Sequence, residues 1–338
     1  MRKVLIIITA CLATLTAIGQ DLHFSQFYDM PLLRNPALSG IFNGLYQAST
    51  IYRNQWNSVT VPYQTLALGA EYKLNGISLD APYTLTLGLQ VLRDQAGAAN
   101  LTRTMYAPNI SGRISLANDL YISAGFLTGP VTSTFNPKGL SWSDQYVNGQ
   151  YSPNNPTAQP IIQNGKDYFD LASGVVIGRS NPDYTQWYLG AAAYHINNPT
   201  VGYGADNRLP IRYTVNGGLG LKMSPEDNTS DRVFFYGDAI VQANQYEYLA
   251  GAIYTVYFPY DTDTDDDGIS FGAFYRWKDA LIPTIKLAYG HWVLGFSYDF
   301  NVSQLNPGSE SLGGAEVMIK FKGFPSEGKG IACPKGGL

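Results

Sequence analysis

The acidic run at residues 261–268 has the clearest capacity for chemistry in this sequence. Its alternate positions repeat the first half of a calcium-binding loop, in which carboxylates converge on a hard cation: Asp263, Asp265 and Asp267. The twelfth position of such a loop requires Glu, but Phe274 stands there, so the run is not an EF-hand. A calcium-binding hairpin stays open as an alternative to an acidic, solvated turn between two strands, which the charge pattern favours.

Support for catalysis is weak in the rest of the chain. The sequence has three His, and it contains neither a Gly-x-Ser-x-Gly elbow nor a His-Glu-x-x-His motif. The carboxylates are scattered, and we expect one such as Asp299 to pair with an Arg or Lys of the interior rather than to act as a catalyst. The sequence therefore predicts a protein that is not an enzyme and that needs no cofactor.

The segment 136–166 is a candidate for contact with a partner protein. It places aromatic residues beside Asn, Gln and Pro, and aromatic side chains with polar tips are favoured at interfaces. The candidate contact residues are Trp142, Tyr146 and Tyr151. A loop that folds over its own protein is the alternative interpretation of this composition.

The first 19 residues have the three parts of a secretory signal peptide. Arg2 and Lys3 are followed by an apolar run and then by small residues, which predicts cleavage after Gly19. The apolar run is short for a spanning helix, and Cys11 comes too early for a lipoprotein. Only Cys333 would remain in the mature chain, so we expect no internal disulfide. The formal net charge of −4 argues against nucleic-acid binding.

The elements that must position these residues show the period-two alternation of β-strands. In the segment 291–302, one face consists of Trp292, Leu294, Phe296, Tyr298 and Phe300, opposite Gly, Ser, Asp and Asn. In the segment 268–278, the same pattern predicts that Tyr275 and Trp277 face lipid, whereas Arg276 and Lys278 face inward. Charged residues make up only 14% of the chain, against about 25% in soluble proteins.

Most of the alternating segments are long enough for tilted strands that cross a bilayer, which takes about 9–11 residues. The predicted strands are 45–56, 64–74, 83–93, 99–115, 119–135, 167–179, 185–197, 209–223, 231–243, 246–258, 268–278, 281–290, 291–302 and 314–323. They predict an all-β fold, a transmembrane antiparallel up-and-down barrel of about 14 strands, an even number as in bacterial barrels.

The strand pattern also predicts the organisation of the chain. We expect a signal peptide at 1–19, an N-terminal periplasmic or plug segment at 20–42, the barrel at 43–324 and a tail at 325–338. With the N-terminus in the periplasm, strand parity places the long connection 136–166 outside the cell, where long loops of such barrels lie.

Short motifs along the mature chain resemble those of the PorP/SprF family. They follow in order at 22–27 (LHFSQF), 35–40 (NPALSG), 52–56 (YRNQW), 94–97 (DQAG), 168–171 (YFDL), 195–199 (HINNP), 209–213 (LPIRY), 275–280 (YRWKDA), 297–303 (SYDFNVS) and 333–334 (CP). The acidic run 261–268 is not part of this pattern. The resemblance implies a bacterial outer-membrane protein of the type IX secretion and gliding machinery, in contact with outer-membrane lipid.

Two functions are compatible with an outer-membrane barrel of this kind. The resemblance implies a partner of type IX secretion components and of a large secreted, adhesin-like surface protein whose export or anchoring the barrel assists. The alternative is a channel or transporter for small or hydrophobic solutes, which an open lumen would favour. A soluble secreted β-sandwich is a third interpretation, and the length and outer faces of the strands argue against it.

Overall fold

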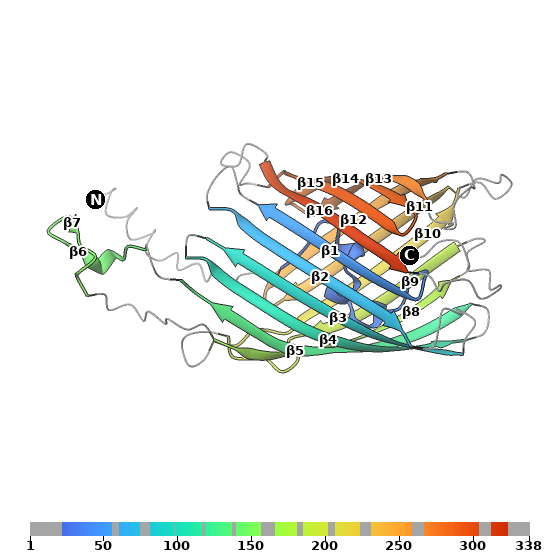
Figure 1. The fold of residues 1–338 in the computed structure, drawn as a ribbon, viewed down its shortest axis with the longest axis horizontal. Helices are drawn as coiled ribbons and strands as arrows, with labels where there is room; N and C mark the ends of the chain where they lie inside the picture. The colour runs from blue at the N-terminus through green and yellow to red at the C-terminus, as the bar shows by residue number, and fades with distance from the viewer. Residues whose placement is uncertain are drawn as a thin grey trace, which may run out of the picture.

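A computed structural model describes most of the chain beyond residue 21: residues 22–55, 61–74, 82–97, 99–116, 119–136, 140–156, 166–180, 185–201, 207–223, 231–258, 267–303 and 312–323. Within these residues, antiparallel strands close into a barrel of 14 strands, which confirms the predicted fold class (Figure 1). Each barrel strand pairs with its neighbours along the chain, and the first and last strands pair at the seam.

The barrel strands agree with the predicted strands to within a few residues at each end. They are β1 (Tyr46–Gln55), β2 (Tyr63–Lys73), β3 (Tyr83–Ala96), β4 (Leu101–Ser115), β5 (Leu120–Thr134), β8 (Tyr168–Ser180), β9 (Thr185–Tyr194), β10 (Arg212–Lys222), β11 (Arg232–Gln242), β12 (Gln245–Tyr257), β13 (Gly268–Arg276), β14 (Ala280–Tyr289), β15 (Trp292–Asn301) and β16 (Leu312–Gly323). Among the described residues, no helix is long and apolar enough to cross a membrane.

The outer surface of the barrel is apolar and aromatic, as the alternation predicts. Leu294 and Phe296 of β15 are about half exposed on this surface, while Ser297, the next residue along the strand, is fully buried on the inner face. The same holds for Tyr275 of β13, which faces outward next to the buried Arg276. A sheet whose outward side chains are apolar over its whole circumference suits contact with hydrocarbon.

Two details of the predicted faces are wrong. Lys278 does not point into the barrel: β13 ends at Arg276, and Lys278 lies exposed in the following turn with a φ of 59°. The inner face is also less polar than predicted, because Phe274, Leu249 and Ile282 point inward and are buried. These apolar residues have a partner inside the barrel that alternation alone does not reveal.

The two ends of the barrel differ. We call the end at which β1 begins and β16 finishes the seam-terminal end, and the opposite end, from which the connection between β5 and β8 leaves, the long-loop end (Figure 1). The pairing thus sets the start of β1 and the long connection at opposite ends, as strand parity predicts. That connection carries the short helix η3 (Ser143–Gln145) and a two-stranded hairpin, β6 (Tyr146–Val147) and β7 (Gln150–Tyr151).

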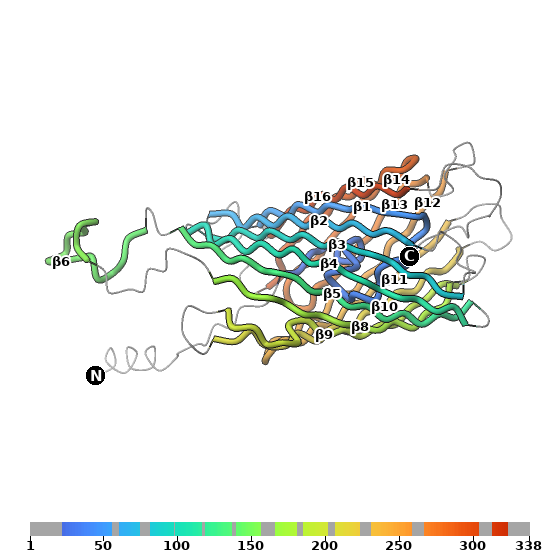
Figure 2. The backbone as a smooth tube through the Cα atoms, turned by 60° about the horizontal axis from the view of Figure 1, so that its bottom comes forward, coloured from blue at the N-terminus to red at the C-terminus, as the bar shows by residue number. Residues whose placement is uncertain are grey.

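The segment 22–42, called the lumen segment below, runs through the inside of the barrel (Figure 2). Leu22 and His23 lie beside Gln242 and Gln245 at the long-loop end. Gly40 and Phe42 bond to residues at the end of β2, at the seam-terminal end. The predicted topology put the start of the mature chain at the seam-terminal end; the described chain instead starts at the long-loop end, because the lumen segment crosses the whole barrel before β1.

Candidate functional site

The lumen segment folds as a series of tight turns. Its helical pieces are η1 (Phe27–Asp29), α2 (Pro31–Arg34) and η2 (Pro36–Leu38). Proline at the first helical position fits the start of a helix, where the missing N–H has no partner to lose. Asn35 caps η2 with its side-chain oxygen, 2.9 Å from the N–H of Ala37. The residue before a proline is disfavoured in a helix, so η1 ends before Met30-Pro31 and α2 ends before Asn35-Pro36, and both helices stay short.

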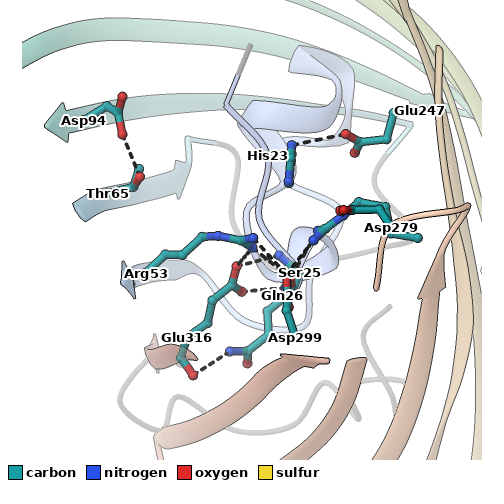
Figure 3. Close-up of polar contacts among 11 residues, drawn as sticks. His23, Ser25, Gln26, Arg53, Thr65, Asp94, Glu247, Asp279, Asp299 and Glu316 are labelled. Atoms are coloured by element: carbon teal, nitrogen blue, oxygen red, sulfur yellow. Dashed lines mark hydrogen bonds and ion pairs between the residues drawn. The ribbon is translucent and has the colours of Figure 1, made fainter. Parts of the chain in front are cut away.

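Ser25 and Gln26 are held by a buried carboxylate of the barrel wall (Figure 3). The backbone N–H groups of Ser25 and Gln26 donate to the two oxygens of Glu316, at 2.7 and 2.8 Å. The hydroxyl of Ser25 donates to Oδ1 of Asp299 at 2.5 Å. Hydrogen bonds to an ionised acceptor are stronger than neutral ones, so these contacts fix the position of the segment.

Two buried arginines balance the charge of these carboxylates. Arg53 on β1 pairs with Glu316 and with Asp299, the latter at 2.8 Å, and Arg276 on β13 also reaches Asp299, at 2.5 Å. The prediction that Asp299 pairs with an interior Arg is confirmed. Buried charges of this kind are tolerated only when they are paired and hydrogen-bonded.

A second ion pair holds the middle of the segment. Arg34 donates to both oxygens of Asp238, with the shortest N–O distance at 2.5 Å, and to the hydroxyl of Tyr188 at 2.8 Å. Its guanidinium also lies 4.8 Å from the ring centre of Phe27. The side chains of Arg34 and Asp238 are both almost fully buried. The planar guanidinium matches a carboxylate in two-point contact, which fixes orientation as well as position.

Apolar packing fills much of the space between these polar contacts. Phe27 meets Phe274 edge to face, with ring centres 5.5 Å apart, and Tyr28 stacks on Tyr236 at 4.9 Å. Residues of the lumen segment therefore cover the inward apolar side chains of β12, β13 and β14. This packing explains why the inner face is not uniformly polar.

The C-terminal part of the lumen segment is bound to the wall at the seam-terminal end. The N–H of Gly40 donates to Glu71 at 2.8 Å, and Gln47 donates to the other oxygen of the same carboxylate at 2.7 Å. Lys73 donates to the carbonyl oxygen of Phe42 at 2.5 Å. Contacts with the wall thus occur along the whole length of the lumen segment.

Two of the three histidines form polar contacts near the long-loop end of the lumen. His23 lies 3.1 Å from Glu247, and the buried His195 lies 2.9 Å from Asp170. Within the described residues, no group of His, Cys, Asp and Glu has the arrangement needed to hold a metal ion. The arrangement around the lumen segment is that of a docking site for a piece of chain, with side chains that bind backbone groups and balance charge.

The residues predicted from the sequence as partner contacts lie away from this interior. Tyr146 and Tyr151 are exposed on the β6–β7 hairpin with ring centres 5.4 Å apart, and Trp142 is partly buried beside it. Asp263 and Asp265 lie outside the described residues. Asp267 is described and is not solvated: it is buried, and its Oδ1 accepts from the N–H of Gly290 at 2.7 Å.

The contacts of the lumen segment were not predicted from the sequence. Its polar residues, such as Ser25 and Arg34, carry no periodic signal, and their partners are hundreds of positions away: Ser25 and Glu316 are separated by 291 residues. The one available signal was the presence of charged residues at inward strand positions, such as Arg53 and Glu71. Buried charges require partners, so these residues indicate that something polar occupies the lumen.

Several solved structures resemble this chain at low identity, among them a channel, a transporter and BamA. The CymD monoaromatic hydrocarbon channel has 10% identity and a TM-score of 0.48 over 88% of this chain and 94% of that chain. The P. putida toluene transporter TodX has 10% identity and a TM-score of 0.42 over 87% and 93%. BamA from Haemophilus ducreyi has 9% identity and a TM-score of 0.40 over 82% and 70%. No curated protein sequence matches this chain.

A closed antiparallel barrel with an apolar outer face and a polar, occupied interior defines the class of outer-membrane β-barrels. Within that class, the sequence pattern of the type IX secretion system membrane protein PorP/SprF matches residues 16–321. The chain belongs to the PorP/SprF family. The match spans the lumen segment and every barrel strand as far as Phe321 of β16, so the resemblance seen in the short motifs extends over the described structure.

Proposed function

We propose that this barrel is a non-enzymatic component of the type IX secretion system that assists the export or surface anchoring of a secreted, adhesin-like protein. The observation that carries the proposal is the lumen segment, docked by buried ion pairs and apolar contacts along the barrel. Such a plug leaves no passage for a folded protein, so a protein partner must bind at the barrel ends and their loops.

The β6–β7 hairpin is the best candidate for that contact. Tyr146, Val147 and Tyr151 are exposed there, on the connection that leaves the long-loop end (Figure 1). Aromatic residues on a projecting element commonly supply the anchors of protein interfaces. Long connections of outer-membrane barrels lie on the extracellular side, and such a location suits contact with a surface protein and with other secretion components.

Replacement of 140–156 by a short Gly-Ser linker tests this proposal. We expect the truncated protein to reach the outer membrane as a heat-modifiable barrel and to lose the secreted partner in cross-linked pull-downs. Tyr146→Ala with Tyr151→Ala should reduce recovery of the partner, whereas Tyr289→Ala, an exposed aromatic near the other end of the barrel, should not. Undiminished recovery with the truncated protein would contradict the proposed contact.

The conductance of the barrel in a planar bilayer separates this function from that of a solute channel. We expect the intact protein to be non-conducting, because the lumen segment is bonded to the wall from the long-loop end to the seam-terminal end. Steady ion conductance by the intact protein would favour the channel or transporter.

A further inference from the structure

A groove of about 490 Å³, called the seam groove below, lies on the outer face of the barrel where β16, β1, β2 and β3 run side by side (Figure 1). Its floor is formed by Ala48 of β1 and Ala70 of β2, which point outward and stand directly opposite each other. The same row continues to Phe321 of β16 on one side and to Leu89 of β3 on the other. Two small residues between two large ones leave a hollow. A water molecule needs about 10–15 Å³ on this measure, so the hollow is much larger than a packing defect.

Aromatic side chains form one wall of the seam groove and lie at one of its ends. The ring of Phe321 meets that of Trp292 edge to face, with ring centres 4.8 Å apart, and its centre lies 6.1 Å from that of Tyr46. Tyr46 and Tyr72 are opposite each other in the next row toward the seam-terminal end, and both are exposed. In the other direction the groove continues over Thr50, toward the middle of β1. The seam groove therefore runs from a pair of tyrosines at its seam-terminal side toward the middle of the barrel wall.

The location and the width of the seam groove favour an alkyl chain as its occupant. Among the described residues that line it, none is charged, and the groove is continuous with the apolar outward face that suits contact with hydrocarbon. The backbones of β16 and β3 are three strand spacings apart, about 14 Å, and the side chains of Phe321 and Leu89 narrow the space between them. An α-helix with its side chains is about 10–12 Å wide and does not enter such a space, whereas an alkyl chain does.

We propose that the seam groove binds one acyl chain of a glycerophospholipid whose headgroup lies beside Tyr46 and Tyr72. The chain lies over Ala48 and Ala70 against the ring of Phe321, and the tyrosine hydroxyls donate to the phosphate, at the headgroup level where membrane proteins place Tyr and Trp. Because the surrounding lipid is as apolar as the groove, the gain comes from van der Waals contact with a wall whose aromatic rings are packed on one another. The proposal concerns the outer face of the barrel and does not depend on the partner contact proposed for the β6–β7 hairpin.

Native mass spectrometry of the detergent-solubilised full mature chain, titrated with palmitoyl-oleoyl phosphatidylethanolamine, tests the seam groove. We expect the first lipid to bind about fivefold or more tightly than the lipids that follow it. Ala48→Leu with Ala70→Leu fills the hollow and should weaken this first step to the level of the others. The matched control is Ala252→Leu with Ala273→Leu, because these two outward alanines also stand directly opposite each other, on β12 and β13. The control should leave the first step unchanged.

Competition on the intact protein tests recognition of the acyl chain without any substitution. Lysophosphatidylethanolamine, which has a single acyl chain, should displace the first lipid, whereas glycerophosphoethanolamine, which has the headgroup alone, should not. Tyr46→Phe removes one donor to the phosphate and should weaken the first step about twofold or more.

Three results would overturn the proposal. The first is a series of equal binding steps in the intact protein. The second is an unchanged first step in Ala48→Leu with Ala70→Leu while the heat-modifiable fold is retained. The third is a dimer of the intact protein that this double change dissociates without any effect on lipid binding, which would assign the seam groove to a second copy of the chain.

Discussion

Arg53 and Glu316 stand directly opposite each other where β1 pairs with β16, and their side chains form a buried ion pair across this seam. The same carboxylate accepts the backbone N–H groups of Ser25 and Gln26. One side chain therefore links closure of the barrel to docking of the lumen segment, and its loss should affect both.

Glu316→Ala should strongly destabilise the barrel, because among the described residues it leaves Asp299 as the one carboxylate paired with the buried Arg53, and it removes the acceptor of two backbone N–H groups. Removal of one member of a buried ion pair costs about 3–5 kcal/mol. The measurement is the temperature at which the folded form disappears on a denaturing gel. Asp279→Asn is the matched control. Asp279, like Glu316, pairs with a buried arginine, here Arg276, but the side chain of Asp279 is 46% exposed, so we expect a loss of about 0–1 kcal/mol. Equal losses in the two variants would contradict the importance of the seam pair.

The pair formed by Arg34 and Asp238 should show strong coupling in a double-mutant cycle. Arg34→Leu leaves a buried carboxylate with one fewer cation, and Asp238→Leu leaves a buried guanidinium, so each single change should cost about 3–5 kcal/mol. The double change removes both charges, and we expect it to cost less than the sum of the two. Urea unfolding followed by tryptophan fluorescence measures the three values. Additive losses would show that the two side chains act independently.

The outward face of β13 should reject a charge most strongly near the middle of the strand. Phe271 is 51% exposed close to the centre of β13, so Phe271→Arg should cost about 2–4 kcal/mol in a bilayer. Trp277 lies just beyond the end of β13, where the cost falls to about 0–1 kcal/mol. Folding yield in lipid vesicles measures both, with Lys278→Ala as a control that should fold normally. A lower yield for Trp277→Arg than for Phe271→Arg would place the membrane midplane elsewhere.

The strands and their outward faces could be predicted from the sequence because alternation is a local property of each segment. Lys278 shows a limit of predictions from alternation: the alternating pattern continues to this residue, but its φ of 59° belongs to a turn after the strand. Phe274 shows another limit: in β13 both faces carry aromatic residues, so alternation between apolar and polar residues disappears where the wall meets the lumen segment. The contacts of Ser25 and Arg34 join residues far apart in sequence, and no short pattern encodes such pairs.

The loop that carries the acidic run should respond differently to changes at its two ends. Asp267→Ala removes the buried carboxylate that accepts the N–H of Gly290, and we expect a loss of about 1–3 kcal/mol. Asp263→Asn with Asp265→Asn should leave stability unchanged, and we expect the intact protein to bind no calcium more tightly than about millimolar. Thermal unfolding and calcium titration check the two expectations. Tight calcium binding that the double change abolishes would favour the calcium-binding hairpin.

The path of the lumen segment constrains the order of events during biogenesis. The lumen segment starts at the long-loop end of the barrel and crosses to the seam-terminal end before β1 begins. Glu316 of the last strand, β16, binds the first part of this segment at Ser25. If the sheet closed first, the segment would have to be drawn lengthwise through a narrow, charged tube. We therefore expect the sheet to close around the lumen segment. A chain truncated before β16 would lack the contacts that Glu316 and Lys320 make with this segment, so the segment would be only partly bound.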